Sequence, residues 1–511
     1  MANEQIESSG WVLYPIGSKP RWGLSFLLGF QHYLTMFGAT VSIPLIVGGA
    51  MGFPPDQLAI LIGTVFFASG IATLFQQFLG NKLPIVQGGS FSFLGPTFAI
   101  IAMVQAQGGN WQMCIQNVAA AIMFASIFEI ILGYSGAVGK IKKFIGPLVI
   151  GPTITMIGLS LFESGAPFMA GNWTISIITL VALIVFSQVF SRKSRFFLLF
   201  PVISAIAVGW ICAVIGTQAG WIPAGNPANL TSAFHNIAAA PWFTIRPLIP
   251  FKWGFPTNTS LLIAGSFGML AAYLASMVES IGDYHSCAKI SEAPPPTERM
   301  ISKGIGSEGL GCLVAGILQS GSGTTSYSEN IGAMGITRVA SRRVIRCGAI
   351  IMLVIPILGK IGALFASLPG PVVGAMYVGL FGLIAAVGLS NLQYVNLNNS
   401  RNLFVLGISL FSGLSVRFAF QSNPISWGAI GTVGGTLGMI LQTILTTAMA
   451  VSALVAIILD NSLPGATRKE RGLTYWEKEA TEESWAKAEA EWTQMKEGEE
   501  RKLAGFEASQ K

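Results

Sequence analysis

Long apolar segments separated by short polar ones make up most of this chain. Each apolar segment runs to about 20 residues, the length that an α-helix needs to cross a hydrocarbon core roughly 30 Å thick. The pattern predicts seven helices before the midpoint, at residues 22–47, 58–79, 93–105, 113–132, 148–162, 175–190 and 196–215. A polar, proline-rich stretch at 217–259 separates them from seven more, at 261–285, 305–318, 330–336, 344–365, 372–389, 403–414 and 430–457. We therefore expect an all-α membrane protein with fourteen transmembrane segments.

The third and tenth segments are too short to cross a membrane alone, and a run rich in glycine and serine begins each one. These runs are QGGSFSF at 87–93 and SGSGTTSYSEN at 320–330. Extended backbone inside a membrane has free N–H and C=O groups, which is tolerable only where they face protein or a wet cavity. Each following half-helix directs the positive end of its dipole at that cavity. We expect short strands before the third and tenth half-helices, with a solute site between them.

The number of segments in each half also predicts the symmetry of the fold. Seven is odd, so the second half must lie upside down relative to the first. The segment GPLVIGPTITMIGL at 146–159 resembles GPVVGAMYVGLFGL at 370–383, and the interrupted segments hold the third place in both halves. The expected fold is a seven-plus-seven inverted repeat.

Basic residues predict which side of the membrane each loop faces, because short loops rich in lysine and arginine stay in the cytoplasm. With a cytoplasmic N-terminus, five basic clusters all fall on the cytoplasmic side: Lys19/Arg21, Lys140/Lys142/Lys143, Arg192/Lys193/Arg195, Arg338/Arg342/Arg343 and Arg401. Both termini are then cytoplasmic, in a multi-pass protein of the plasma or inner membrane. The C-terminal tail, rich in Glu, Lys and Ala, is expected to be a solvated helix or a disordered segment.

Composition supports a membrane protein and argues against several kinds of functional site. With 52% hydrophobic and 10% charged residues, the chain is unlike a water-soluble domain. Its five cysteines are scattered singly and it has three histidines, so neither disulfides, a metal centre nor a nucleophile with a partnered base is indicated. His235 and His285 fall in or near predicted loops, where a solvated histidine is expected. We expect neither an enzyme nor a protein that holds a metal or a nucleic acid.

A few ionisable residues lie deep in predicted spans, where charge is costly and therefore usually functional. Glu279 and Asp283 are four residues apart, and so share one face of the eighth helix. Glu329 ends the extended run of the tenth segment. Gln31 and His32 in the first helix either line the cavity or bond to a neighbouring helix. These five residues are the first candidates for the site.

The segment SENIGAMGITR at 328–338 resembles the signature of the nucleobase/ascorbate transporter family. The matching residues are Glu329, Asn330, Gly332, Thr337 and Arg338. Similar stretches are the QH pair of the first helix, the QGGSFSF run, VESIGD in the eighth helix and residues 388–407. The likeness covers roughly residues 22–459 and fails over both tails.

The resemblance implies a core domain (22–145 and 261–366) that moves against a gate domain (146–216 and 367–460) in a homodimer. A cytoplasmic N-terminal tail (1–21), an extracellular or periplasmic loop (217–260) and a cytoplasmic C-terminal tail (461–511) complete the chain. Transport in the family is coupled to H⁺ or Na⁺, and no other cofactor is implied.

The resemblance also implies roles for individual residues in binding the solute between the half-helices. Glu279 and Glu329 hydrogen-bond the ring, main-chain groups of Phe91 and Ser328 contribute further bonds, and Tyr327 packs on the substrate. The residues implied to support the site or its coupling are Asp283, His32, Gln31, Asn330, Thr337 and Arg338.

Glu329 favours a neutral substrate, because a buried carboxylate repels an anion yet accepts hydrogen bonds from ring N–H groups. We expect cation-coupled import of a nucleobase, either uracil or a purine such as xanthine or hypoxanthine. Ascorbate is the alternative within the family, since residues 337–343 and 388–407 resemble the ascorbate and plant branches. An anion transporter of the same fold is a further alternative, but the half-helix dipoles there attract anions without added acids, so Glu279 and Glu329 argue against it.

Overall fold

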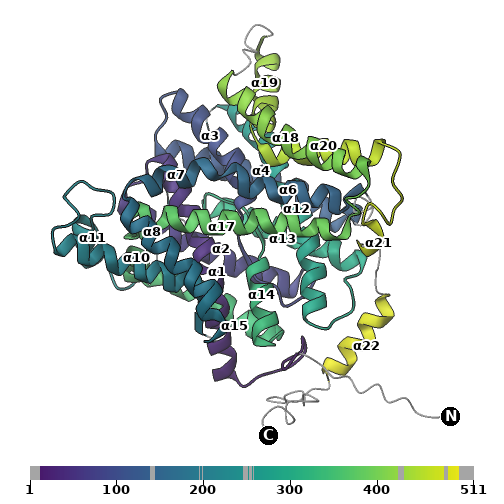
Figure 1. Ribbon diagram of the computed structural model, residues 1–511, viewed down its shortest axis with the longest axis horizontal. Helices are drawn as coiled ribbons and strands as arrows, with labels where there is room; N and C mark the ends of the chain where they lie inside the picture. Colours follow the sequence, from purple (N-terminus) through teal and green to yellow (C-terminus); the bar gives the residue numbers. More distant parts are fainter. Residues whose placement is uncertain are drawn as a thin grey trace.

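Every predicted membrane segment has a helical counterpart in this computed structural model (Figure 1). The structure describes residues 12–476 and 481–493, apart from 139–143, 195, 198–199, 245–250, 252–255, 257 and 424–430. The predicted basic residues Lys140, Lys142, Lys143 and Arg195 lie outside the described residues.

The first half begins with α1 (Trp22–Met51), α2 (Pro55–Phe78), β1 (Gln87–Gly89), η1 (Phe91–Phe93), α3 (Leu94–Ala106) and α4 (Trp111–Tyr134). It continues with α6 (Pro147–Ser160), α7 (Phe162–Ala170), α8 (Trp173–Ile184), η3 (Val185–Val189), η4 (Phe190–Arg192), α10 (Pro201–Gln218) and α11 (Thr231–Ala239).

The second half begins with α12 (Thr259–Ile290), α13 (Glu298–Ile317), β2 (Thr324–Ser326), α14 (Ser328–Thr337), α15 (Arg342–Val354), η6 (Ile355–Ile357) and α16 (Gly359–Ala366). It continues with α17 (Gly370–Ser390), η7 (Asn391–Tyr394), α18 (Ser400–Ser422), α19 (Gly431–Leu445) and α20 (Ala448–Ser462). The tail forms α21 (Leu473–Trp476) and α22 (Glu482–Thr493).

Nine helices of the described chain are long and apolar enough to cross a membrane, or ten if the pair from α15 to α16 is one span bent by 84°. The other predicted segments correspond to shorter or more polar helices, namely α3, α13, α14 and the pair α19 and α20. The half-helices α3 and α14 are short because extended backbone occupies part of each crossing.

The two predicted strands form and pair with each other. β1 and β2 are antiparallel, with Gln87 opposite Ser326 and Gly89 opposite Thr324. This pairing satisfies backbone N–H and C=O groups that would otherwise be unpaired within the membrane. As a result, the N-terminal ends of the two half-helices lie close together near the middle of the molecule.

The two segments of internal similarity lie side by side. They form α6 and α17, which pack against each other through the middle of the molecule (Figure 1). A Cβ atom on Gly158 would overlap the carbonyl oxygen of Phe381, so this close approach requires glycine. This contact pairs equivalent elements of the two halves.

Two predicted element boundaries were wrong. The last segment, predicted as one helix over 430–457, is two helices, because the chain breaks at Thr446 and Thr447, between α19 and α20. The polar stretch at 217–259 is also not entirely loop, since it contains α11. A short amphipathic helix among prolines has too few turns to stand out as a periodic pattern.

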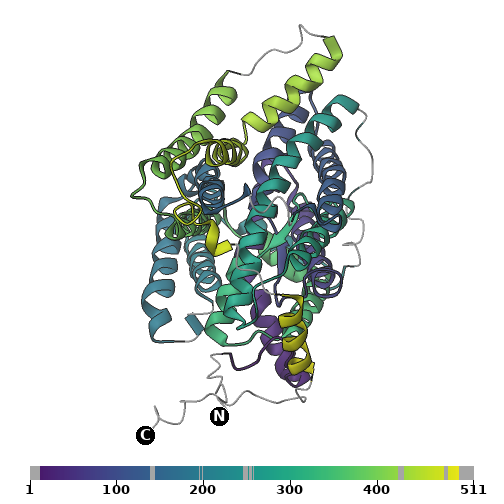
Figure 2. The same cartoon turned by 90° about the vertical axis from the view of Figure 1, so that its right-hand side faces the viewer.

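The tail helix, one of the two predicted alternatives, forms as α22, and most of its residues are exposed. The helix α22 lies against the N-terminal segment before α1 in both views (Figures 1 and 2). Trp485 in this helix is only 4% exposed, and Leu473 in α21 is 3% exposed. The tail is therefore a largely exposed helix, as predicted, but one face of it packs on the membrane domain, which the prediction did not include.

Candidate functional site

Helix α12 places one carboxylate against each half-helix. Glu279 and Asp283 share a face of this helix because they are four residues apart. The Ser92 hydroxyl of η1 donates to Glu279 Oε2 at 3.3 Å. The Ser328 hydroxyl at the start of α14 donates to Asp283 Oδ1 at 2.8 Å. The two acids thus connect the starts of both half-helices to one helix.

A cavity of about 460 Å³ lies in front of these carboxylates. It is lined by six of the predicted site residues: Phe91, Glu279, Asp283, Tyr327, Ser328 and Glu329. Its opposite wall consists of apolar residues of α6 and α17, including Ile154 and Ile384. It reaches the surface at the exposed residues Ser390 and Gln393, on the side where the tail packs.

Tyr327 lines this cavity with its hydroxyl group anchored. That hydroxyl donates to the Gly89 carbonyl at 2.6 Å and accepts from the Thr40 hydroxyl at 3.0 Å. These bonds join α14, β1 and α1. The ring therefore has a fixed position beside Glu329 and Ser328.

His32 and Asn330 lie behind the cavity and do not line it. The Asn330 amide donates to the His32 carbonyl at 2.9 Å, and its nitrogen lies 3.1 Å from His32 Nδ1. Both side chains are buried, so they hold α14 on α1. Gln31 is half-buried on α1 and also does not line the cavity.

Thr337 and Arg338 end α14 at a distance from the carboxylates. The Thr337 hydroxyl donates to the Ala333 carbonyl at 2.9 Å. Arg338 takes a left-handed conformation with φ of 61°, and its carbonyl accepts from the backbone N–H groups of Leu13 and Tyr14. The structure therefore places these two signature residues where α14 meets the N-terminal segment.

Sequence reasoning missed Glu308 of α13, which is only 1% exposed. Its Oε1 atom accepts from Gln87 Nε2 at 3.1 Å, from the Ser280 hydroxyl at 2.8 Å and from the Ser326 hydroxyl at 2.5 Å. The Glu308 side chain therefore links both strands to α12. An acid inside an apolar segment was the available signal, and it is the same signal that singled out Glu279.

The prediction of a solvated His285 was also wrong. This residue lies within α12, its Nδ1 atom is 2.8 Å from the Ile281 carbonyl, and it lines the cavity. The helix continues to Ile290, beyond the predicted end at residue 285. His285 therefore belongs to the wall between the carboxylates and the cavity mouth.

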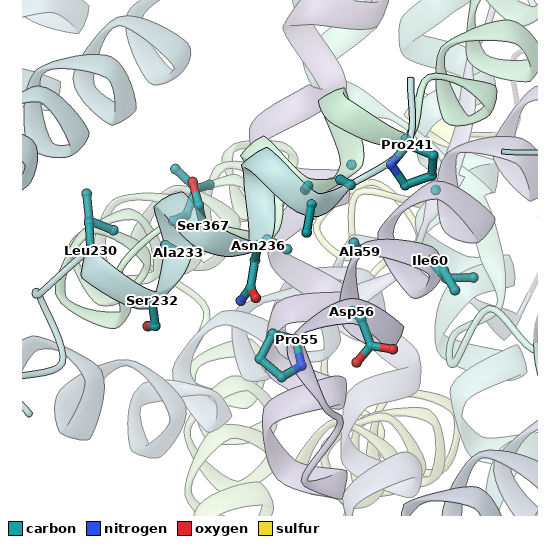
Figure 3. A pocket seen from close by; sticks show the side chains of 18 of the residues that line it. Pro55, Asp56, Ala59, Ile60, Leu230, Ser232, Ala233, Asn236, Pro241 and Ser367 are labelled. Carbon is teal, nitrogen blue, oxygen red and sulfur yellow. The ribbon is translucent and has the colours of Figure 1, made fainter. Parts of the chain in front are cut away.

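A larger cavity of about 880 Å³ lies near the opposite end of α17 (Figure 3). It lies between the start of α2, the loop helix α11, α16 and the start of α17, and Asp56 and Asn236 are among its polar residues. It includes none of the predicted site residues. Although this cavity is larger, it is not the candidate solute site, because the carboxylates and the starts of the half-helices converge on the smaller cavity.

The described residues include no group of three or more His, Cys, Asp and Glu side chains placed to hold a metal ion. What the candidate site offers is hydrogen bonding. It combines carboxylate acceptors with main-chain groups at the starts of two half-helices and aromatic rings. Such a set suits a small planar solute with ring N–H and carbonyl groups.

A sequence profile described as a permease family matches residues 23–422. The chain is 42% identical over 510 residues to solute carrier family 23 member 2 of Homo sapiens, an alignment that covers 91% of this chain and 77% of that protein. It is 36% identical over 483 residues to nucleobase-ascorbate transporter 1 of Arabidopsis thaliana, covering 91% of this chain and 92% of that protein.

Among solved structures, the chain resembles murine solute carrier 26 family member A9, an anion transporter in the inward-facing state. The TM-score is 0.52 at 12% identity, over 82% of this chain and 68% of that one. At this identity the likeness concerns the fold alone. The helices described above therefore share the fold of that structure.

Proposed function

Since the chain belongs to the nucleobase/ascorbate permease family, we propose that it imports a neutral nucleobase, uracil or a purine such as xanthine or hypoxanthine, by cation symport. One observation carries this proposal: Glu279, Asp283 and Glu329 line one cavity whose described wall contains no lysine or arginine. An anionic solute would meet three acids without a compensating lysine or arginine. A neutral base would instead offer them ring N–H donors.

The binding geometry follows from the positions of these groups. Glu279 and Glu329 accept hydrogen bonds from two N–H groups of the ring. Glu329 accepts as a carboxylate, which makes the stronger bond, and Glu279 accepts through an oxygen that the coupling ion leaves free. Main-chain groups at Phe91 and Ser328 bond the remaining ring heteroatoms. Tyr327 packs on the ring, and Asp283 holds Ser328 in place through their 2.8 Å bond.

The coupling ion, H⁺ or Na⁺, enters at Glu279 in this proposal. A cation there removes the repulsion between neighbouring carboxylates, so that the base binds only after the ion. A proton serves this purpose on one carboxylate oxygen, whereas sodium requires several oxygen ligands. The hydroxyl of Ser92, 3.3 Å from Glu279, is available to either ion.

Movement of a core domain against a gate domain completes the proposed cycle. The core comprises α1–α4 and α12–α16, and the gate comprises α6–α10 and α17–α20, in fourteen membrane segments with both termini in the cytoplasm. The cavity lies between them and opens beside Gln393, which corresponds to an inward-facing state. On its other side, the Tyr377 hydroxyl of the gate donates to the Ser42 carbonyl of the core at 3.1 Å.

The homodimer is also part of the proposal. Helix α18 of the gate presents large apolar side chains to the surface, with Phe411 72% and Phe418 70% exposed. A membrane or a second copy of the chain covers such a face.

Ascorbate is the second candidate function. The starts of two half-helices meet at the cavity, and helix N-termini attract anions. The name of the plant relative includes ascorbate as well as nucleobase. If ascorbate is the substrate, the bound cations must offset the three acids.

Gradient-driven uptake tests the proposal. Purified protein in proteoliposomes receives labelled uracil under an imposed H⁺ gradient or an imposed Na⁺ gradient, with unlabelled uracil, xanthine, hypoxanthine or ascorbate as competitors. We expect one gradient to drive accumulation and neutral bases to block it. Competition by ascorbate alone would refute the nucleobase assignment and favour the second candidate.

A further inference from the structure

The C-terminal helix α22 docks on the core through one face. Trp485, Glu489 and Trp492 are spaced by four and three residues, so they lie on the same side of the helix. Trp485 is 4% exposed, and its indole N–H donates to the Pro295 carbonyl at 2.7 Å, in the connection between α12 and α13. The Trp485 and Trp492 rings meet edge to face with centroids 5.8 Å apart.

Charged and polar contacts extend this face. Glu489 pairs with Arg342 at the start of α15 at 2.9 Å, and the same guanidinium lies 5.9 Å from the centre of the Trp492 ring. At the other end, the Thr297 hydroxyl donates to Glu482 Oε1 at 3.0 Å. A Cβ atom on Gly17 would overlap Trp492, so the N-terminal segment also fits closely against the helix. These partners all belong to the core or to the segment that leads into it.

The chain just before α22 is anchored to the gate instead. Arg471 makes two bonds to the carboxylate of Asp460 at the end of α20, each 2.9 Å long. Asp460 also pairs with Arg401 of α18 at 2.6 Å, and its side chain is fully buried. The Glu470 carbonyl accepts from the backbone N–H of Asn396 at 2.9 Å. A buried, doubly paired carboxylate makes this a firm attachment.

The two anchors lie on opposite rims of the cavity mouth. Tyr394, which lines the cavity on the gate side, lies beside Gly472 of the tail. Ile290 lines the cavity on the core side, five positions before Pro295. Five residue steps join Trp476 to Thr481, and such a stretch spans at most roughly 18 Å. The length of the chain therefore limits how far the rims can separate.

We propose that the C-terminal tail is a strap that ties the gate to the core across the inward mouth of the cavity and slows the exchange between inward-facing and outward-facing states. This inference rests on the proposed movement of the two domains. While α22 is docked, a displacement of the core beyond the reach of this connection must pull on the anchor at Asp460. Release of the helix removes that restraint without altering a residue of the solute site.

Cutting the strap after reconstitution tests this directly. A protease site is inserted immediately before Thr481, and the purified full chain is placed in proteoliposomes and then cleaved, so that folding and insertion precede the cut. The control has the same insertion in an uncleavable form and receives the same protease. The first readout is the spin-label distance between Lys289→Cys on α12 and Gln393→Cys on η7, in a background that lacks the half-buried Cys212. The second is the rate of uracil counterflow.

We expect cleavage to broaden the distance distribution and to raise the counterflow rate by about twofold or more. Trp485→Ala should act in the same direction without a cut, whereas Lys487→Ala, on the exposed side of α22, should not. An unchanged distribution and rate after complete cleavage would overturn the strap. The distance readout needs no solute, so a strap that responds to cleavage in a protein that does not carry uracil would refute only the proposed substrate.

Discussion

Ser92 and Glu279 join the first half-helix to α12 through a 3.3 Å hydrogen bond from the serine hydroxyl to the carboxylate. Ser328 and Asp283 make the equivalent connection to the second half-helix, at 2.8 Å. One helix therefore contacts the starts of both half-helices. An ion or solute that binds either carboxylate would therefore act directly on the start of a half-helix.

Glu279→Gln tests whether this carboxylate couples the ion to transport. Glutamine keeps the shape and the bond from Ser92 but cannot be ionised. We expect the variant to fold and to lose accumulation of nucleobase against a gradient, because an amide cannot take up and release the coupling ion as a carboxylate does, so that binding of the base no longer depends on the ion. Uptake into proteoliposomes measures this, and concentrative uptake equal to that of the wild type would contradict the role.

Glu329→Gln separates charge from hydrogen bonding in substrate choice. The variant should bind neutral bases about tenfold more weakly, because a neutral acceptor replaces a charged one. It should also let ascorbate compete better, because one negative charge has left the cavity. Competition assays with uracil and ascorbate measure both effects. An unchanged preference would show that Glu329 does not select the substrate.

Gly332→Val should discriminate between one-ring and two-ring bases. A Cβ atom on Gly332 would meet no heavy atom within 4 Å, and the residue lines the cavity, so the valine side chain would project into it. We expect purine uptake to fall about tenfold more than uracil uptake, as a cost of roughly 1.4 kcal/mol would produce. Gly382→Val on α17, which also meets no neighbour and does not line the cavity, is the matched control. Equal losses for both ring sizes would argue against this geometry.

Asn330→Ala should destabilise the fold without changing the residues that line the cavity. The variant loses the 2.9 Å bond to the His32 carbonyl and leaves buried groups unpaired, which costs about 1–3 kcal/mol. A lower melting temperature in detergent is the expected result. Asn117→Ala, whose amide bonds back to Met113 in its own helix, serves as the control. If both variants melted at the wild-type temperature, Asn330 would not hold α14 on α1.

Tyr377→Phe should loosen the contact between gate and core. It removes the 3.1 Å bond to the Ser42 carbonyl, whose net worth is about 0.5–1.5 kcal/mol. The inward-facing population should therefore fall by up to about tenfold relative to the outward-facing one. Spin-label distances across the cavity mouth report this shift. A distribution like that of the wild type would show that this bond does not bias the two states.

The two places where a strand leads into a half-helix could be predicted well from the sequence, because short-range sequence features determine them. Glycine and serine runs before short apolar segments indicated β1 and β2, since broken helices need flexible, small residues. Glu279 and Glu329 stood out because acids are rare in lipid. That Glu279 and Glu329 share one cavity with Phe91 and Tyr327 could be predicted only from the family resemblance, because these residues are far apart in the chain.

Other features depended on tertiary contacts that periodicity does not encode. The docking of Trp485 depends on Pro295, and that of Trp492 on Gly17 and Arg342, all distant in sequence. Without knowledge of these three contacts, the sequence of a polar helix predicts that it is solvated. Glu308 was missed for a different reason, since its partners Gln87 and Ser326 converge on it only after the strands pair.

Direct binding of uracil to the purified protein tests whether the carboxylate-lined cavity holds a neutral base. Titration calorimetry compares the wild type with Glu279→Gln and Glu329→Gln, using uracil, xanthine and ascorbate in the presence and absence of sodium at two pH values. We expect a neutral base to bind the wild type more tightly than ascorbate does. Glu329→Gln should weaken the binding of the base about tenfold, and Glu279→Gln should remove its dependence on sodium or pH. Tight ascorbate binding with no binding of any neutral base, unaffected by either variant, would contradict this expectation.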